Sequence, residues 1–284
     1  MRALSYGVFV SELFVQRLTV LDFSYLDVER GLVGESWQAD IVLQGDLDAQ
    51  GMVLDFGDVK KITKKLIDEQ FDHKLLVPNS SPAFQHASEC LTFTLNSGKN
   101  IIHCGPEDAV TLIHADAITP ETVSRQIIDT LMPLMPSNVV SIQIHLWPEK
   151  ISGAFYHYSH GLKLHCGNCQ RIAHGHRSRI EILRNGERDH ELEAHWATRW
   201  RDIYIGTRED LIDETDGDYR FAYTSAQGAF ALQLPKSDCY LIDTESTVEN
   251  IAQHLADALK HEHPEDNFQV RAFEGVDKGA IGRA

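Results

Sequence analysis

The feature that most constrains the fold of this chain is an internal repeat. Residues 143–154 align without a gap on residues 269–280. Upstream, each half has two adjacent apolar residues, a short gap and then a threonine that can cap a helix. This threonine is Thr119 in one half and Thr247 in the other. The repeat spacing is roughly 128 residues, which indicates two copies of one domain.

Each copy follows the element order of an α+β domain. We divide the chain into residues 1–150 and residues 151–284. In the first copy, alternating β-branched and aromatic residues predict a half-buried hairpin from residues 13–28 and 37–47. One-sided apolar spacing predicts a helix over residues 58–71. This pattern predicts two antiparallel sheets, each with its own helices.

Composition and charge exclude several classes of protein. The net charge of −16 and the pI of about 5.3 disfavour contact with phosphate backbones, so we expect no nucleic-acid partner. The sequence has no apolar run of roughly 18 residues and no signal-peptide pattern, so we expect no membrane partner. Five cysteines, an odd number, do not suggest a disulfide framework. We interpret the chain as a cytoplasmic protein with reduced thiols.

Three histidines lie close together in the second copy. His174 and His176 are two residues apart, so a strand places both on one face. His160 joins them if residues 155–162 pair antiparallel with residues 178–183. Three neutral imidazoles with an open fourth position form the ligand set of a catalytic zinc ion rather than a structural one. The alternative is that His174 and His176 are a surface pair, because a chain with 15 histidines contains two at this spacing by chance fairly often.

A cysteine lies in the loop between these strands. Beside a dication, the thiol of Cys169 would be driven toward the thiolate and would serve as a nucleophile or base. Cys166 competes with it for this role. The Cys-x-x-Cys spacing of the two also allows half of a zinc knuckle or a redox pair. No second Cys-x-x-Cys motif exists to complete a four-thiolate zinc site. This motif also does not open a helix after a buried strand, as a redox Cys-x-x-Cys would.

An acid–histidine pair, Asp72 and His73, follows the helix expected in the first copy. The helix dipole alone favours a histidine at such a position. Alternatively, Asp72 and His73 form a catalytic pair. That interpretation depends on the segment before the helix, Gly51-Met-Val-Leu-Asp55-Phe56.

These stretches resemble the family of 6-pyruvoyltetrahydropterin and 6-carboxytetrahydropterin synthases. The resemblance rests on four short motifs: Phe155 through His160, the loop cysteine, His174-Gly-His176, and the Gly51 segment with its helix and Asp72-His73. It implies that the three histidines bind Zn²⁺ and that Cys169 is the catalytic thiol. It further implies that Asp72 and His73 relay the thiol proton and that a late glutamate, Glu274, holds the pterin ring.

The resemblance also carries expectations about fold and substrate. It implies the tunnelling fold, in which antiparallel sheets of several domains close into a barrel with helices outside, and hence a homo-oligomer. The implied small-molecule substrate is the pterin 7,8-dihydroneopterin triphosphate. The expected product is 6-carboxy-5,6,7,8-tetrahydropterin, on the route to queuosine, with 6-pyruvoyltetrahydropterin as the alternative. Candidates to bind the triphosphate are Arg171, Arg177 and Arg179, unless these arginines form a solvated strand face.

The two copies have lost complementary parts of this pattern. Opposite His174-Gly-His176 the first copy has Val33-Gly34-Glu35, and opposite His160 it has Leu26 or Asp27. Opposite Glu274 it has Pro148. In the second copy, residues 200–207 replace the Gly51 segment. No Asp-His pair follows the helix that we expect at residues 209–214, because Asp189-His190 lies before that helix. We therefore expect one composite site, with zinc, Cys169 and Glu274 from the second copy and Asp72 and His73 from the first.

Two other functions stay open at this point. One is a different zinc-dependent lyase or aldolase acting on a related pterin. The other is a non-catalytic pterin- or purine-binding protein of the tunnelling fold with a structural zinc ion. Inserted hairpins at residues 92–104 and 219–234 lie outside the minimal family domain, where they would narrow the substrate mouth or serve assembly.

Overall fold

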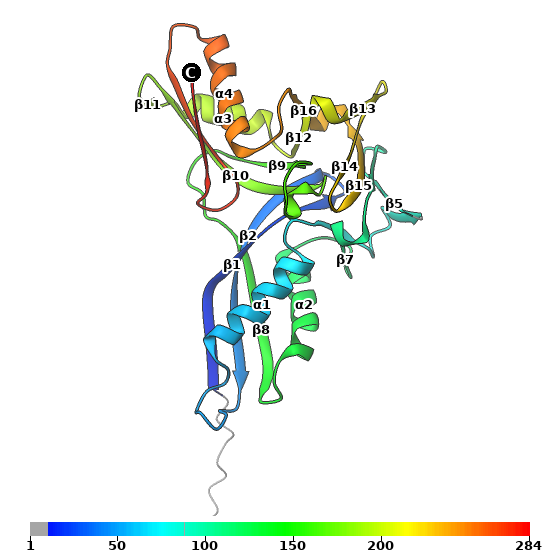
Figure 1. Ribbon diagram of the computed structural model, residues 1–284, viewed down its shortest axis with the longest axis vertical. Coiled ribbons are helices and arrows are strands. Elements are labelled where there is room, and N and C mark those ends of the chain that lie inside the picture. The colour runs from blue at the N-terminus through cyan, green and yellow to red at the C-terminus, as the bar shows by residue number, and fades with distance from the viewer. Residues whose placement is uncertain (1–10, 88) are drawn as a thin grey trace, which may run out of the picture.

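The first copy forms one sheet with two helices on it, as seen in the lower half of Figure 1. The computed structural model describes residues 11–87 and 89–284. The strand order of this sheet is β7-β3-β1-β2-β8, and β1 and β2 form a long antiparallel hairpin. The expectation of a wholly antiparallel sheet was wrong, because β3 pairs parallel with β1, after a helical crossover, and also with β7. Its strands are β1 (Ser11–Asp27), β2 (Gly31–Gly45), β3 (Leu75–Pro78), β7 (Val110–Ile113) and β8 (Val139–Pro148).

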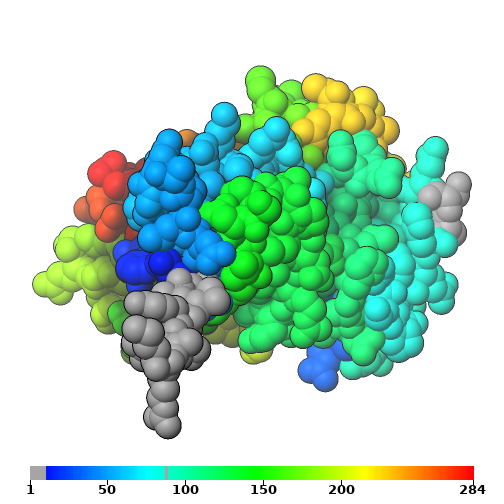
Figure 2. Space-filling view, turned by 90° about the horizontal axis from the view of Figure 1, so that it is seen from below, coloured from blue at the N-terminus to red at the C-terminus, as the bar shows by residue number. Residues whose placement is uncertain are grey.

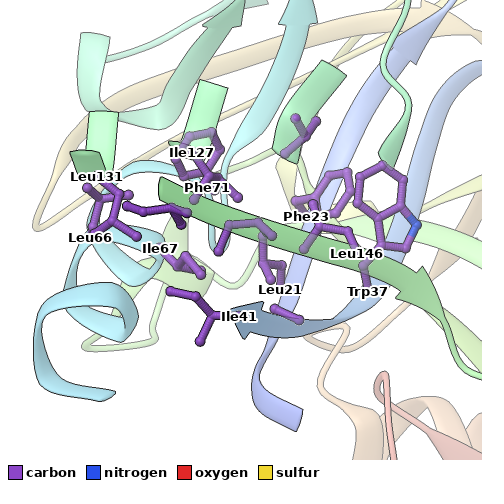
Figure 3. Close-up of a cluster of buried hydrophobic side chains, with 14 of the residues drawn as sticks. Leu21, Phe23, Trp37, Ile41, Leu66, Ile67, Phe71, Ile127, Leu131 and Leu146 are labelled. Carbon is purple, nitrogen blue, oxygen red and sulfur yellow. The ribbon is translucent and has the colours of Figure 1, made fainter. Parts of the chain in front are cut away.

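Capping and one-sided burial explain the two helices of this copy. In α1 (Phe56–Gln70), the Asp55 side chain accepts a hydrogen bond from the Gly57 backbone, which caps the helix. Thr119 caps α2 (Pro120–Leu131), with proline at the first helical position. Both helices pack on one face of the sheet through a core that Figure 3 shows. That core contains Leu21, Phe23, Trp37, Ile41, Leu66, Ile67, Phe71, Ile127 and Leu131.

The second copy repeats this arrangement at the other end of the molecule (Figure 1). Its main strand order is β16-β12-β9-β10-β17-β18, and β11 pairs with β10. Thr247 caps α4 in the same way as Thr119 caps α2. The elements are β9 (Phe155–His160), β10 (His174–Arg184), β11 (Glu187–Arg188), α3 (His190–Arg199), β12 (Ile203–Thr207), β16 (Cys239–Ile242), α4 (Val248–Glu262), β17 (Phe268–Phe273) and β18 (Gly279–Arg283).

The inserted hairpins of the two copies join into a third sheet. Strand β15 of the second copy pairs antiparallel with β6 of the first, with Leu232 opposite His103. The strand order is β13-β14-β15-β6-β5-β4. These strands are β4 (Phe84–Ala87), β5 (Cys90–Thr94), β6 (Asn100–Cys104), β13 (Leu211–Glu214), β14 (Asp218–Ser225) and β15 (Gly228–Pro235). In the view of Figure 2, the atoms of this region coloured cyan lie beside those of α1 and α2.

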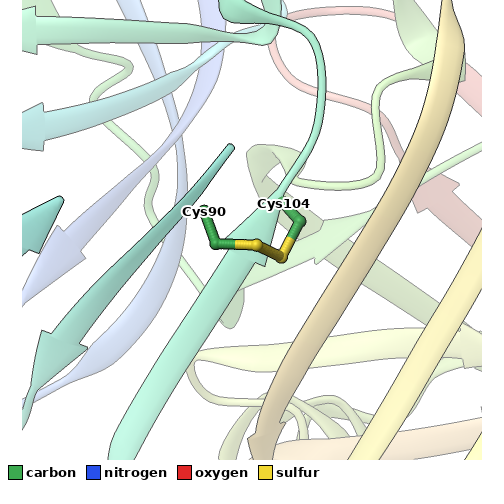
Figure 4. Close-up of a disulfide and its surroundings, with 2 residues drawn as sticks. All are labelled: Cys90 and Cys104. Atoms are coloured by element: carbon green, nitrogen blue, oxygen red, sulfur yellow. A yellow bond between two sulfur atoms is a disulfide. The ribbon is translucent and has the colours of Figure 1, made fainter. Parts of the chain in front are cut away.

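One disulfide corrects the expectation of uniformly reduced thiols. Cys90 and Cys104 are bonded across β5 and β6, with their Cα atoms 4.2 Å apart (Figure 4). Counting cysteines cannot reveal this pair, because the bond depends on the register of two short strands. Cys166, Cys169 and Cys239 are free.

The helix expected at residues 209–214 was wrong. Residues 208–210 form a single 3-10 turn, and 211–214 form β13, which pairs with β14. The second-copy counterpart of α1 is α3, whose first turn is capped by the Asp189 side chain. Asp189-His190 therefore begins this helix. Residues 200–207 do not replace the Gly51 segment, since they follow α3 and enter β12.

The expected hairpin and the expected helix of the first copy are present with shifted ends. Strand β2 begins at Gly31, earlier than residue 37, and α1 covers Phe56–Gln70 rather than residues 58–71. No helix in the described part of the chain is both long and apolar enough to cross a membrane.

Candidate active site

The three histidines meet where β9 pairs with β10. His174 lies opposite His160, and His176 lies opposite Tyr158. Residues 155–160 thus pair with 174–179 and not with 178–183, because the loop between the strands ends earlier than expected. All three imidazoles are fully buried, and one ring nitrogen from each lies within 4.8 Å of the other two.

The free nitrogens of these rings form a donor set suited to a metal ion. The Nδ1 atoms of His160 and His174 lie 2.9 Å from the carbonyl oxygens of Ser246 and Arg171. The three Nε2 atoms are buried and have no hydrogen-bond partner among the described residues. Burial and neighbouring imidazoles lower the pKa of His160 and of His174, so both rings are neutral. Neutral imidazoles with the second nitrogen hydrogen-bonded are typical ligands of Zn²⁺.

Cys169 and the Asp72–His73 pair lie beside these histidines. His73 follows α1 with a φ of 53°, and its Nδ1 is 2.6 Å from Asp72 Oδ2. His73, Cys169 and His174 place one donor atom each within 4.8 Å of one another. Burial opposes protonation of His73. Hydrogen bonds to Asp72 and Cys169 outweigh burial and raise the pKa of His73 to about 10. Cys166, in contrast, is exposed.

Close backbone contact between the copies brings these groups together within one chain. Ser24 Oγ and Ser159 Oγ are 2.7 Å apart at the contact. A Cβ atom on Gly175 would lie 2.6 Å from Gly34 Cα, so the residue between the two histidines has to be glycine. As a result, the His73 ring of the first copy lies 5.3 Å from the His174 ring of the second.

Glu274 also lies at the site, on the turn after β17. Its Oε1 is 3.8 Å from His176 Nε2, and its side chain is 23% exposed. A partly exposed carboxylate at this position can accept hydrogen bonds from a ligand with paired N–H groups.

Of the three candidate arginines, only Arg171 contacts the Asp72–His73 pair. It is buried, and its Nη1 is 3.3 Å from the His73 carbonyl oxygen. Arg177 stacks on Phe155, and Arg179 pairs with Asp277. These two therefore match the strand-face alternative.

Sequence comparison decides the family. The sequence profile described as 6-pyruvoyl tetrahydropterin synthase matches residues 28–158 and again residues 150–283. The chain belongs to this synthase family. Two proteins named "Putative 6-carboxy-5,6,7,8-tetrahydropterin synthase", from Pyrococcus horikoshii and Pyrococcus abyssi, are 23% and 22% identical over 134 residues. The matches cover 47% of this chain and 79% of each relative.

Solved structures of the synthase family resemble about half of the chain. The 6-pyruvoyl tetrahydropterin synthase of Plasmodium vivax is 18% identical and has a TM-score of 0.43. That match covers 50% of this chain and 93% of the Plasmodium chain. The Plasmodium falciparum synthase is 17% identical, with a TM-score of 0.42, and the match covers 48% and 90% of the two chains.

Strand register identifies the equivalent positions in the two synthase-family copies. Ser24 pairs with Gly34 and Leu75, as Ser159 pairs with Gly175 and Tyr204. The counterparts of His160, His174 and His176 are therefore Tyr25, Val33 and Glu35. This corrects Leu26 or Asp27 as the counterpart of His160. The same register places Pro148 opposite Trp37 in the first copy.

The equivalent position in the first copy holds an ion pair. Arg30 donates to both carboxylate oxygens of Asp202, at 3.0 and 2.5 Å, and to the Tyr25 hydroxyl at 2.8 Å. Asp202 is the counterpart of His73, because His73 lies two residues before Leu75 and Asp202 lies two residues before Tyr204, the equivalent strand residue. An arginine thus links the counterparts of His160 and His73, and this position lacks the three-imidazole set.

Sequence reasoning missed Asp22, a buried carboxylate on β1. Its Oδ1 lies 3.3 Å from His176 Nδ1, and Lys278 Nζ lies 3.0 Å from its Oδ2. Burial opposes its charge, but His176 and Lys278 outweigh burial and hold the pKa of Asp22 below its usual range. The available signal was an acid alone in the apolar run of β1, where a charge is costly unless paired.

Proposed function

We propose that this chain is a zinc-dependent pterin synthase with one composite site. Its substrate is 7,8-dihydroneopterin triphosphate and its product is 6-carboxy-5,6,7,8-tetrahydropterin. The observation that carries the proposal is the convergence of three unpartnered Nε2 atoms beside Cys169 and His73. The names of the Pyrococcus relatives favour the carboxylated product.

In this proposal the metal is held by His160, His174 and His176. When bound, Zn²⁺ would act as a Lewis acid that lowers the pKa of the hydroxyl groups on the pterin side chain. The open position of a three-histidine site leaves room for such a ligand.

The remaining chemistry belongs to residues of the chain. Cys169 moves a proton at a side-chain carbon of the substrate, and His73 exchanges that proton with the thiol. Asp72 fixes the His73 ring by the 2.6 Å contact at Nδ1, so that Nε2 of His73 is directed away from Asp72. Glu274 accepts hydrogen bonds from the N–H edge of the pterin and fixes its orientation.

Two buried cations suit the triphosphate. Lys74, the residue after His73, is 6% exposed; its carbonyl oxygen accepts a hydrogen bond from the Ser24 N–H, but its Nζ has no hydrogen-bond or ion-pair partner among the described residues. Burial and the nearby Arg171 lower the pKa of Lys74. Lys74 also lines a cavity of about 1330 Å³ between β7 and the third sheet. We infer that the triphosphate extends from the site toward Lys74 and Arg171.

The proposed oligomer follows from the ends of the sheets. Strands β8 and β18 are the last strands of the first and second sheets. Because sheet edges carry unpaired backbone groups, a further copy of the chain can complete them and close a barrel.

The test is incubation of zinc-loaded protein with 7,8-dihydroneopterin triphosphate, with mass spectrometry of the products. We expect 6-carboxytetrahydropterin together with released triphosphate and acetaldehyde. Formation of 6-pyruvoyltetrahydropterin without acetaldehyde would assign the other synthase reaction. Bound but unchanged pterin would overturn catalysis in favour of a binding protein.

A further inference from the structure

Asp22 is the point at which the two copies meet beside the histidines. It is 3% exposed, and its Oδ1 accepts a hydrogen bond from Ser36 Oγ at 2.5 Å. Its other oxygen accepts from Lys278 Nζ at 3.0 Å, and Oδ1 also lies 3.3 Å from His176 Nδ1. The carboxylate of the first copy thus contacts two elements of the second copy, β10 and the β17–β18 turn.

The backbone of the same residue holds the catalytic pair. The Asp22 N–H donates to Asp72 Oδ1 at 2.8 Å, and the Asp22 carbonyl oxygen accepts from the His73 N–H at 2.6 Å. One strand residue therefore contacts Asp72, His73 and His176 at once.

His176 differs from the other two histidines in the group that lies nearest to its Nδ1 atom. The Nδ1 atoms of His160 and His174 are hydrogen-bonded to backbone carbonyl oxygens. His176 Nδ1 has no hydrogen bond among the described residues and lies 3.3 Å from the Asp22 carboxylate, the contact that we expect to shorten when a metal is bound. An imidazole whose Nδ1–H points at a carboxylate keeps Nε2 free as a ligand, and the carboxylate makes the ring a stronger donor to a metal. The His176 Nε2 is one of the three unpartnered atoms of the site.

We propose that Asp22 is a positioning residue, supplied by the first copy, that orients His176 as a metal ligand and ties it to the Asp72–His73 pair. This inference rests on the proposed function in one respect, that the three histidines bind a metal. It goes beyond that function because it makes zinc affinity depend on a residue of the first copy, which supplies none of the three histidine ligands.

The equivalent positions in the other half supply a control. His157 is the counterpart of Asp22, and Glu35 is the counterpart of His176. His157 Nδ1 is 2.7 Å from the Gly34 carbonyl oxygen and 3.8 Å from Glu35 Oε2, so a histidine and an acid again lie near each other, with the histidine now on the strand equivalent to that of Asp22. Like Asp22, Glu35 has a buried carboxyl group at the contact between the copies. Glu35→Gln therefore replaces a buried carboxyl group by an amide at the equivalent contact without touching the histidine set.

The experiment is titration of metal-free full-length protein with Zn²⁺ against a chelator, for wild type, Asp22→Asn and Glu35→Gln. We expect Asp22→Asn to bind zinc about 10 to 100 times more weakly and Glu35→Gln to bind like wild type. Thermal unfolding of the metal-free proteins shows whether each variant is folded. Equal zinc affinity of folded wild type and Asp22→Asn would overturn the role of Asp22 and leave the proposed function standing. A wild type that binds no zinc would overturn both.

A second measurement covers the case in which Asp22→Asn does not fold. In zinc-loaded wild type, nitrogen-15 NMR of the histidine rings reports which nitrogen carries the proton. We expect the His176 Nδ1 proton to resonate further downfield than those of His160 and His174, because its acceptor is a carboxylate. A His176 ring without a proton on Nδ1 would contradict the proposal.

Discussion

His73 and Asp202 occupy the same position in the two copies and have the same unusual backbone conformation. Each follows the helix of its copy, with φ values of 53° and 55°. In the first copy this position presents an imidazole to the histidine cluster, and in the second it presents a carboxylate to Arg30. One backbone geometry thus carries an imidazole of the candidate active site in one half and a carboxylate of an ion pair in the other.

We predict that Asp202→Asn lowers stability without changing the chemistry. Asparagine tolerates a positive φ, but Arg30, whose side chain is 31% exposed, loses its counter-charge. Because Arg30 is partly solvated, we expect a loss of about 2 kcal/mol, less than for a fully buried pair. Urea unfolding measures this loss. A turnover that fell more than tenfold in the folded variant would show that the ion pair is not merely structural.

The two cysteines of the loop should behave differently. We expect Cys169→Ala to lower turnover by about 100-fold or more, because it removes the proton-transfer group beside His73. The exposed Cys166 is the matched control, and Cys166→Ala should retain wild-type turnover and zinc content. The reverse result would assign the catalytic role to Cys166.

Gly175 should not accept a side chain. A Cβ there would lie 2.4 Å from the Tyr158 carbonyl oxygen on the neighbouring strand, 2.6 Å from Gly34 Cα and 2.7 Å from Ser24 Oγ, so both the strand pairing and the contact between the copies would have to shift. We expect Gly175→Ala to cost about 3 kcal/mol of unfolding free energy. At Gly217 a Cβ meets no atom within 4 Å, so Gly217→Ala should be nearly neutral. Equal stability of the two variants would refute the close contact.

Glu35 makes stability depend on pH. Burial raises its pKa from an ordinary 4.5 to about 7, so between these values the folded protein holds a proton that the unfolded chain releases. Its stabilising effect is therefore complete below pH 4.5 and is lost as pH rises through 7, a change on the order of 3 kcal/mol. Glu35→Gln lacks this titration. We expect the free energy of unfolding of Glu35→Gln, relative to that of wild type, to increase between pH 4.5 and pH 8. The same pH dependence for the two proteins would contradict this prediction.

The sequence predicted the duplication well, because aligned segments keep their places in the fold. Residues 143–148 and 269–273 lie in β8 and β17, the equivalent strands. Thr119 and Thr247 cap equivalent helices. Helix α3 was missed because Asp189-His190 was compared with Asp72-His73, whereas Leu192, Trp196 and Trp200 carry the apolar helical spacing.

The composite site could be anticipated only in part. Reciprocal loss of motifs suggested that the copies share one site, but motif loss gives no distances. The contact of Asp22 with His176 joins strands of different copies, and no local pattern specifies such a contact. The Arg30–Asp202 pair was invisible for the same reason.

The most direct test of the shared site is to measure zinc content and turnover together in His73→Ala and in the matched variant Asp202→Asn. The account predicts that His73→Ala binds one zinc ion per chain, as wild type does, yet makes product at about 1% of the wild-type rate or less. Asp202→Asn should bind one zinc ion and turn over normally. Near-wild-type turnover by His73→Ala would contradict the claim that the first copy supplies the catalytic pair to the metal site of the second.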